Sequence, residues 1–265
     1  MRLKDLVVMV VEGSAMQQKI VAGALRAHGV RDLRQVRSGA AALALLGEAP
    51  VDLLISAMYL DDMTGSELLH AVRGDERSRE TAFVLISSET DAQVLDPIRQ
   101  AGVIAILSKQ GFSADSLRDA LRATLQYYES GDELIAGREP EDLQVLLVDD
   151  SEMSRKHVRR LLGNMGIEQI DEAADGKAAC ELLAQRFYDV AFTDYNMPGM
   201  DGRELVEYVR SSSSQPSLPV LMITSESDRR RLAEVERAGV SAICDKPFDP
   251  TRVRGLLDGV LREAQ

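Results

Sequence analysis

The sequence has 265 residues, of which 45% are hydrophobic and 28% are charged, and its formal net charge at pH 7 is −12. This length suits one or two globular domains. The acidic balance argues against a nucleic-acid-binding surface, which needs clustered lysine and arginine, and fits cations or basic patches on partner proteins. The two cysteines, Cys180 and Cys244, lie far apart in apolar runs, which predicts buried, reduced thiols.

The sequence also argues against membrane insertion. No apolar run approaches the length of a membrane span. The first residues lack a signal-peptide core followed by a cleavage site, and Leu6–Val11 fits a strand better. We therefore expect a cytoplasmic protein that binds neither membranes nor nucleic acid.

Residues 1–130 alternate between short apolar runs, typical of buried strands, and longer segments with helical periodicity. The predicted strands are near Val7–Val11, Leu33–Val36, Leu53–Ser56, Phe83–Ser87 and Ile104–Leu107. The predicted helices are near Ala15–His28, Ala40–Gly47, Ser66–Arg73, Ala92–Ala101 and Ser113–Tyr128.

A charged stretch with two glycines and a proline follows, and we interpret residues 131–142 as a linker. Residues 143–265 then repeat the alternation. The predicted strands are near Val145–Val148, Gln169–Glu172, Asp189–Thr193, Val220–Thr224 and Ala242–Cys244. The predicted helices are near Met153–Asn164, Gly176–Gln185, Arg203–Ser211, Arg229–Ala238 and Pro250–Arg262.

The two halves are copies of one another. Landmarks recur at a constant offset of 137 residues, pairing Glu12 with Asp149, Ala57 with Asp194, and Lys109 with Lys246. Strands that alternate with helices predict an α/β fold with a parallel sheet covered on both faces. We therefore expect two doubly wound, flavodoxin-like (βα)5 domains, each with a five-stranded sheet of order 2-1-3-4-5.

Polar residues stand where the strands of the second copy end. The third predicted strand ends on Asp194 and is followed by the turn signals Pro198-Gly199 and Asp201-Gly202. The carboxyl ends of parallel strands form the ligand-binding edge of such a sheet. The other strand ends at this edge carry Asp149-Asp150, Thr224-Ser225 and Lys246-Pro247.

This set of strand ends, in this order and spacing, resembles the receiver domain of two-component response regulators over residues 143–265. The resemblance implies that Asp194 is a nucleophile that accepts a phosphoryl group. Thr224 would donate a hydrogen bond to that group, and Lys246 would offset its charge. The resemblance also allows a cis peptide bond between Lys246 and Pro247.

The same resemblance implies a magnesium site. Three converging carboxylates repel one another unless a cation compensates, and Mg²⁺ prefers such oxygen ligands. Asp150 and Asp194 would bind Mg²⁺ directly, Asp149 would act through a water molecule, and the backbone carbonyl of Asn196 would supply a further oxygen.

The first copy lacks this set and resembles a degenerate receiver, or pseudo-receiver. Ala57 replaces the acceptor aspartate and Glu12-Gly13 replaces the acidic pair, although Ser87 and Lys109 remain. We expect this domain to keep the fold, to bind no metal at its degenerate site, and to serve docking or dimerisation.

The sequence therefore predicts a response regulator that is not an enzyme beyond its own phosphorylation and dephosphorylation. Its partners would be a histidine kinase or phosphotransfer protein, and its output a protein–protein interaction. Two alternatives stay open: the front part of a longer regulator with a further effector domain, and an aspartyl-phosphate phosphohydrolase. The second is disfavoured because such enzymes usually carry Asp-x-Asp, where this sequence has Asp194-Tyr195-Asn196.

Side chains beside the acceptor predict a short-lived phosphorylated state. Residues two positions after the acceptor and two after the threonine flank the path of the hydrolytic water in receivers, and here they are Asn196 and Glu226. Both are polar and Ser225 is small, so we expect a lifetime of seconds to minutes.

Overall fold

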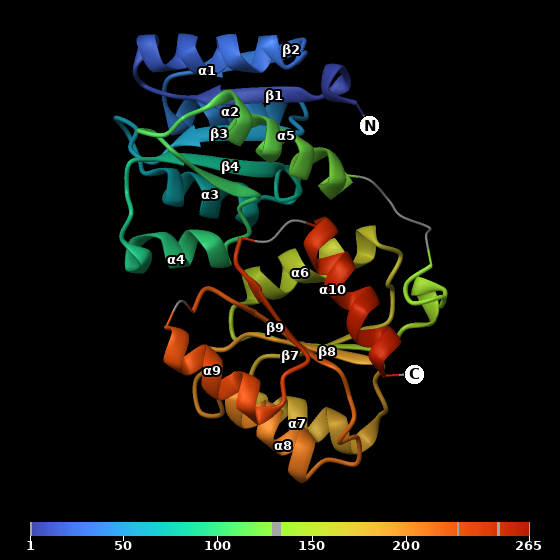
Figure 1. Cartoon of the computed structure of the whole chain (residues 1–265). Coiled ribbons are helices and arrows are strands. Elements are labelled where there is room, and N and C mark those ends of the chain that lie inside the picture. The colour runs from blue at the N-terminus through green and yellow to red at the C-terminus, as the bar shows by residue number, and fades with distance from the viewer. Residues whose placement is uncertain (1, 129–133, 227, 248–249, 265) are drawn as a thin grey trace. The chain divides into compact units, whose positions relative to one another are not determined.

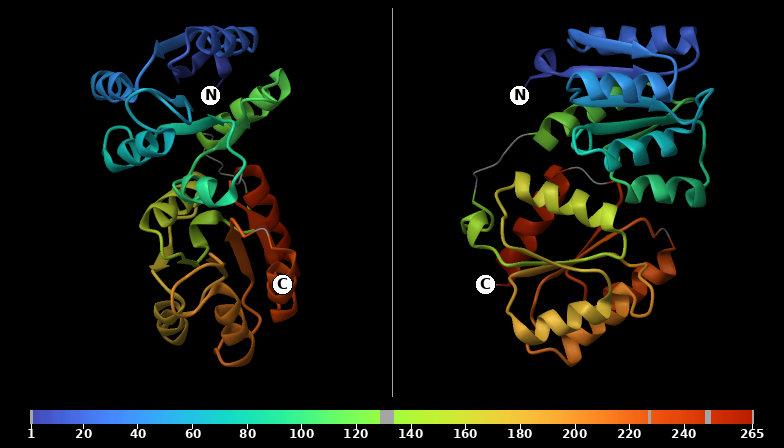
Figure 2. Two further views of the ribbon diagram at one scale, coloured as in Figure 1. Left: turned by 90° about the vertical axis from the view of Figure 1, so that its left-hand side faces the viewer. Right: turned by 180° about the vertical axis from the view of Figure 1, so that it is seen from behind.

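The computed structural model describes residues 2–128, 134–226, 228–247 and 250–264. The chain divides into two compact units, Met1–Glu129 and Ser130–Gln265 (Figure 1). Each unit has its own parallel five-stranded sheet with helices on both faces (Figures 1 and 2). In the part of the chain that the structure describes, no helix is long and apolar enough to cross a membrane.

The sheet of the first unit has the order β2-β1-β3-β4-β5, as predicted. Its strands are β1 (Val7–Val11), β2 (Asp32–Val36), β3 (Leu53–Ala57), β4 (Ala82–Ser87) and β5 (Ala105–Ser108). The helices are α1 (Ala15–Ala27), α2 (Gly39–Glu48), α3 (Gly65–Gly74), α4 (Ala92–Gln100) and α5 (Ala114–Tyr128). Helices α1 and α5 pack together with one face of the sheet.

The second unit repeats this topology with the order β7-β6-β8-β9-β10. Its strands are β6 (Val145–Val148), β7 (Ile170–Ala173), β8 (Val190–Thr193), β9 (Val220–Thr224) and β10 (Ala242–Asp245). The helices are α6 (Glu152–Asn164), α7 (Gly176–Gln185), α8 (Gly202–Ser211), α9 (Arg229–Ala238) and α10 (Pro250–Glu263). Helices α6 and α10 share a core with one face of the sheet, and α7, α8 and α9 with the other.

Strand β8 shows why the centre of this sheet is predictable. All four of its residues are buried. Val190 and Phe192 point into the core with α6 and α10, whereas Ala191 points into the core with α7 to α9, because side chains alternate along a strand. A strand covered on both faces is expected to be largely apolar, and β8 is apolar up to its last residue, Thr193, whose hydroxyl donates to the carbonyl of Asp194.

The chain leaves β8 through Asp194 and returns into α8 at a tight contact. A side-chain carbon at Gly202 would overlap the carbonyl oxygen of Asp194. Asp201 caps α8 by accepting a hydrogen bond from the Glu204 amide, and Glu204 caps the Asp201 amide in return. These contacts fix the loop that follows Asp194 against the sheet edge.

The described part of the segment expected to be a linker packs on the second unit. Ile135 is fully buried in the core of that unit, and the amide of Ala136 donates to Asp258 Oδ1 at 2.7 Å. Arg138 pairs with Asp189 at 2.8 Å, and a short 3-10 helix, η2, spans Pro140–Asp142. The rest of the expected linker lies outside the described residues, apart from Leu134, which is half-exposed.

Candidate functional site

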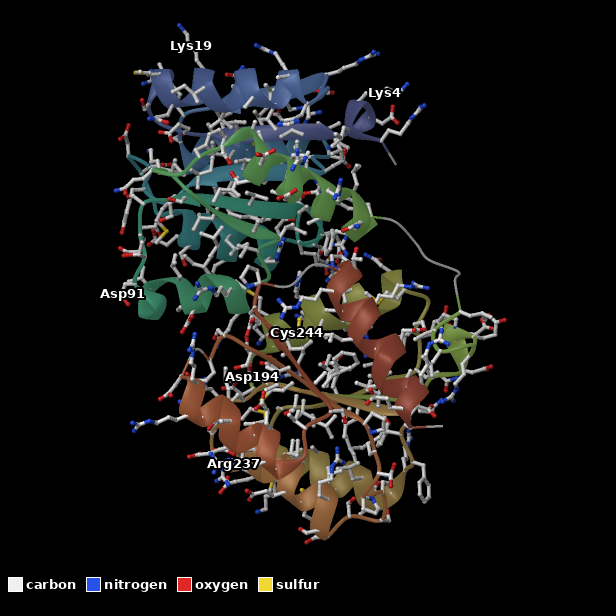
Figure 3. All side chains as sticks on the ribbon, viewed as in Figure 1. Lys4, Lys19, Asp91, Asp194, Arg237 and Cys244 are labelled. Carbon is white, nitrogen blue, oxygen red and sulfur yellow. The ribbon has the colours of Figure 1, made fainter. Side chains whose placement is uncertain are left out.

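Four parallel strands of the second unit end at one edge and carry the predicted residues. Asp149 follows β6, Asp194 follows β8, Thr224 ends β9, and Lys246 follows β10. Backbone hydrogen bonds hold these ends side by side: the amide of Asp194 donates to Val148 at 2.8 Å, and that of Lys246 donates to Thr224 at 2.8 Å. Figure 3 labels Asp194 at this edge. The order of the strands in the sheet therefore brings these predicted side chains together at one edge.

The ammonium group of Lys246 is the centre of this cluster. Its Nζ lies 2.9 Å from Asp149 Oδ2 and 3.1 Å from Asp194 Oδ1, and it donates to the hydroxyl of Ser154 at 3.0 Å. Lys246 is only 5% exposed, and Asp149 and Asp194 are 4% and 2% exposed. The peptide bond between Lys246 and Pro247 is cis, which the resemblance allowed. One cation thus binds two carboxylates away from bulk water.

The remaining oxygens of the two carboxylates are also held. Asp194 Oδ2 accepts a hydrogen bond from the backbone amide of Asn196 at 2.9 Å. Asp149 Oδ1 accepts from the amide of Ser151 at 2.9 Å, and Asp149 Oδ2 accepts from the hydroxyl of Ser154 at 2.5 Å. The carboxylate of Asp194 is therefore oriented before any partner arrives.

Burial and charge act differently on the two ends of this cluster. Burial raises the pKa of the Asp194 carboxyl, and the nearby Asp149 carboxylate adds to this effect, against the opposing attraction of Lys246. For Lys246, burial alone would lower the pKa, but the attraction of Asp194 and Asp149 outweighs it and raises the pKa. Burial is thus the main cause for Asp194, whereas for Lys246 the attraction of two carboxylates exceeds the effect of burial.

The other predicted residues lie around this cluster and differ in how far their side chains are exposed to solvent. Thr224 is fully buried, and its hydroxyl accepts a hydrogen bond from the amide of Glu226 at 3.0 Å. Ser225 is half-buried, whereas Asp150 and Asn196 are exposed. An exposed carboxylate and an exposed amide beside a buried acceptor leave the site open to a partner.

The donor atoms fit Mg²⁺. Asp149, Asp150 and Asp194 follow the adjacent strands β6 and β8 and offer hard oxygen ligands. A single lysine cannot neutralise two buried carboxylates, so a cation would offset the excess charge. Within the described ranges, no three carboxylate, imidazole or thiolate side chains form a metal cage by themselves. Mg²⁺ usually takes one or two carboxylates and completes its shell with waters and phosphate oxygens.

Three further residues contact this site or its flanking loop and were not predicted from the sequence. Ser154, buried in the first turn of α6, bridges Asp149 and Lys246. Tyr195 is 2% exposed, and Arg231 of α9 contacts its ring and its hydroxyl. A hydroxyl in the first helical turn after a strand that ends in an acid was a usable signal for Ser154. No sequence signal pointed to Arg231, because it is one of three consecutive arginines.

The equivalent edge of the first unit carries a different set. Ala57 is buried and has no nucleophile. Glu12 Oε2 lies 3.4 Å from Lys109 Nζ, and Glu12 Oε1 accepts from the amide of Ser14 at 2.9 Å. The hydroxyl of Ser87 accepts a hydrogen bond from the amide of Glu89 at 2.9 Å. At this edge Glu12 pairs with Lys109, Ala57 and Gly13 contribute no carboxylate, and the carboxylate of Asp61 lies beside Gly13.

Other polar groups of that edge serve the fold. The carbonyl of Gly13 accepts hydrogen bonds from the Arg37 guanidinium at 3.0 and 2.7 Å. The carboxylate of Asp62 accepts from the amides of Gly39 and Ala40, at the start of α2. Asp62 thus satisfies free amides at a helix N-terminus.

We expect the first unit to be indifferent to Mg²⁺. Residues 1–130 expressed alone should unfold cooperatively, because this unit has its own core, and millimolar Mg²⁺ should leave their melting temperature unchanged. Residues 131–265 measured in the same buffers are the positive control, with a higher melting temperature in Mg²⁺. A clear Mg²⁺-dependent rise in the melting temperature of residues 1–130 would contradict the expectation that this unit binds no metal ion at its degenerate site.

Comparison with known proteins places both units in one family. The model described as "Response regulator receiver domain" matches residues 8–122 and again residues 145–258. The chemotaxis protein CheY-3 of Vibrio cholerae serotype O1 is 37% identical over 119 residues, which is 45% of this chain and 92% of that protein. The chemotaxis protein CheY of Pseudomonas aeruginosa is 39% identical over 106 residues, or 40% of this chain and 86% of that protein.

Two solved structures are also similar. CheY4 of Vibrio cholerae covers 44% of this chain and 98% of its own, with 35% identity and a TM-score of 0.42. A protein described as a probable two-component system response regulator/GGDEF domain protein covers 98% of this chain and 99% of its own, with 21% identity and a TM-score of 0.44.

Because the family model matches most of the chain, the protein belongs to the response regulator receiver family. It carries two receiver domains in tandem and is a two-component response regulator. The resemblance drawn from the strand ends is confirmed.

Proposed function

We propose that Asp194 accepts a phosphoryl group from a histidine kinase or a phosphotransfer protein. The observation that carries this proposal is the buried cluster in which Lys246 contacts both Asp149 and Asp194. An oxygen of the Asp194 carboxylate would form the new bond to phosphorus while the bond to the donor breaks. Lys246 would stabilise the added negative charge, and the hydroxyl of Thr224 would donate to a phosphoryl oxygen.

Mg²⁺ would be held by Asp150, Asp194 and the backbone carbonyl of Asn196, with Asp149 acting through water. When bound, it would offset charge on the transferring phosphoryl group. The two receivers would divide their roles. The first, with Ala57 in place of an acceptor, would be a pseudo-receiver for docking or dimerisation, and output would be a protein–protein interaction.

Incubation of the purified full chain with acetyl phosphate and Mg²⁺ tests this proposal. Intact-mass spectrometry should find one phosphoryl group per chain, absent when EDTA replaces Mg²⁺. The adduct should survive acid and be lost in base, as an acyl phosphate is. Two groups per chain would refute the division of roles, and none would refute the proposal. Steady turnover of a phosphomonoester would instead favour the phosphohydrolase, which the single aspartate of Asp194-Tyr195-Asn196 disfavours.

A further inference from the structure

The side chain of Arg231 joins the two loops that flank the proposed acceptor. It forms an ion pair with Glu226, donates from Nη2 to Asn196 Oδ1 at 3.2 Å, and donates from Nε to the hydroxyl of Tyr195 at 3.1 Å. Its guanidinium carbon also lies 4.4 Å from the centre of the Tyr195 ring. Tyr195 is buried in the core with α7 to α9, so this contact anchors the arginine to a rigid part of the unit.

Hydrogen bonds also attach both loops to the sheet edge that carries Asp194 and Thr224. The amide of Asn196 donates to Asp194, and the amide of Glu226 donates to Thr224. The carboxylate of Glu226 is largely buried, with 11% of the side chain exposed. Its Oε1 accepts from the amide of Asp228 at 2.9 Å, and its Oε2 pairs with Arg231. Arg231 therefore engages acceptor oxygens of Asn196 and Glu226, which lie two positions after Asp194 and two positions after Thr224.

We propose that Arg231 is a positioning residue that slows hydrolysis of phosphorylated Asp194, an inference that rests on the proposed function. In hydrolysis a water oxygen attacks phosphorus, the bond from phosphorus to the Asp194 oxygen breaks, and inorganic phosphate leaves. The water proton passes to a nearby acceptor or to solvent. A carboxylate oxygen that already pairs with a guanidinium and an amide oxygen that already accepts a hydrogen bond are less available to bind and orient the attacking water. Arg231 holds Glu226 and Asn196 in this restrained state.

Replacing Arg231 should release the carboxylate of Glu226 and the side-chain amide of Asn196. In Arg231→Gln we expect the phosphoryl group to decay about threefold to fivefold faster, the range in which a partly exposed ion pair shifts an equilibrium. Arg231→Lys keeps the charge beside Glu226 but cannot engage all three partners, so its decay should be intermediate. Arg230→Gln removes the same charge from an exposed side chain of the same helical turn and should leave decay unchanged.

The full chain of each variant is phosphorylated with acetyl phosphate and Mg²⁺, the donor is removed, and the adduct is followed by intact mass. The rate of phosphorylation is measured in parallel, because a merely structural defect would change both rates. In a Glu226→Gln background, Arg231→Gln should accelerate decay less than it does alone. A phosphoryl group that decays at the same rate or more slowly in Arg231→Gln overturns this inference and leaves the proposed function intact. Absence of any adduct on the natural chain overturns both.

Discussion

Asparagine in place of Asp194 should leave the full chain without any phosphoryl adduct under conditions in which the natural chain takes up one. The amide cannot act as the nucleophile, and the first receiver offers no replacement because Ala57 stands at the equivalent position. We expect complete loss, measured by intact mass after treatment with acetyl phosphate and Mg²⁺. Glu181→Gln removes an exposed acid on α7 and should phosphorylate normally. An adduct that persists in Asp194→Asn would place the acceptor elsewhere.

The same substitution should stabilise the second unit when Mg²⁺ is absent. A carboxyl whose pKa is higher in the folded state than in the unfolded state destabilises the fold once it ionises. This penalty is absent below the unfolded pKa and grows as the pH rises toward the folded pKa. At pH 7 the asparagine should therefore raise the free energy of unfolding by on the order of 1 kcal/mol. The gain should vanish near pH 3 and shrink in saturating Mg²⁺, which stabilises only the natural site.

The central sheet of each unit was predictable because its strands are covered on both faces. Runs such as Val190–Thr193, which is apolar up to its last residue, stand out between helical segments. Edge strands β2 and β7 carry exposed or half-exposed residues and give a weaker signal. The predicted starts differ from the observed ones by one residue both there and at the buried strands β4 and β8, which is the usual scatter of element ends. The polar strand ends were informative because a buried strand has no structural use for an acid or a lysine at its end.

The contacts that join different elements were not predictable in the same way. The position of Ser154 in the first turn of α6 signals a hydroxyl near the strand end, but only the folded structure shows that it bridges Asp149 and Lys246. Arg229, Arg230 and Arg231 are consecutive, and the sequence does not say which of them reaches Tyr195. Residues 134–142 have the composition of a linker, yet Ile135 and Pro140 are buried because nearby elements of the second unit cover them. Such burial depends on tertiary packing rather than on local pattern.

Methionine in place of Lys246 should have the largest effect on stability. The lysine is 5% exposed and contacts Asp149, Asp194 and Ser154, so its loss leaves two buried carboxylates without a cation. Removing one partner of a buried ion pair destabilises a protein by about 3–5 kcal/mol. We expect a loss near the lower end of this range at pH 7 in EDTA, because methionine keeps the apolar stem of the side chain and its packing.

The pH dependence of this loss identifies its cause. In the natural chain the raised pKa of Lys246 means that its contribution is fully present below the unfolded lysine pKa, about 10.4, and is lost only as the pH rises through the folded pKa. In Lys246→Met the carboxylate of Asp194 loses the attraction of the lysine that opposes the effect of burial on its pKa, so it binds a proton more readily. The deficit should therefore be largest at neutral pH and shrink as the pH falls toward 4. Urea unfolding of the full chain at pH 7 and pH 4.5, with Lys177→Met on the surface of α7 as the control, measures this. A deficit of the same size at both pH values would mean that lost packing, rather than the uncompensated charge of Asp149 and Asp194, destabilises the variant.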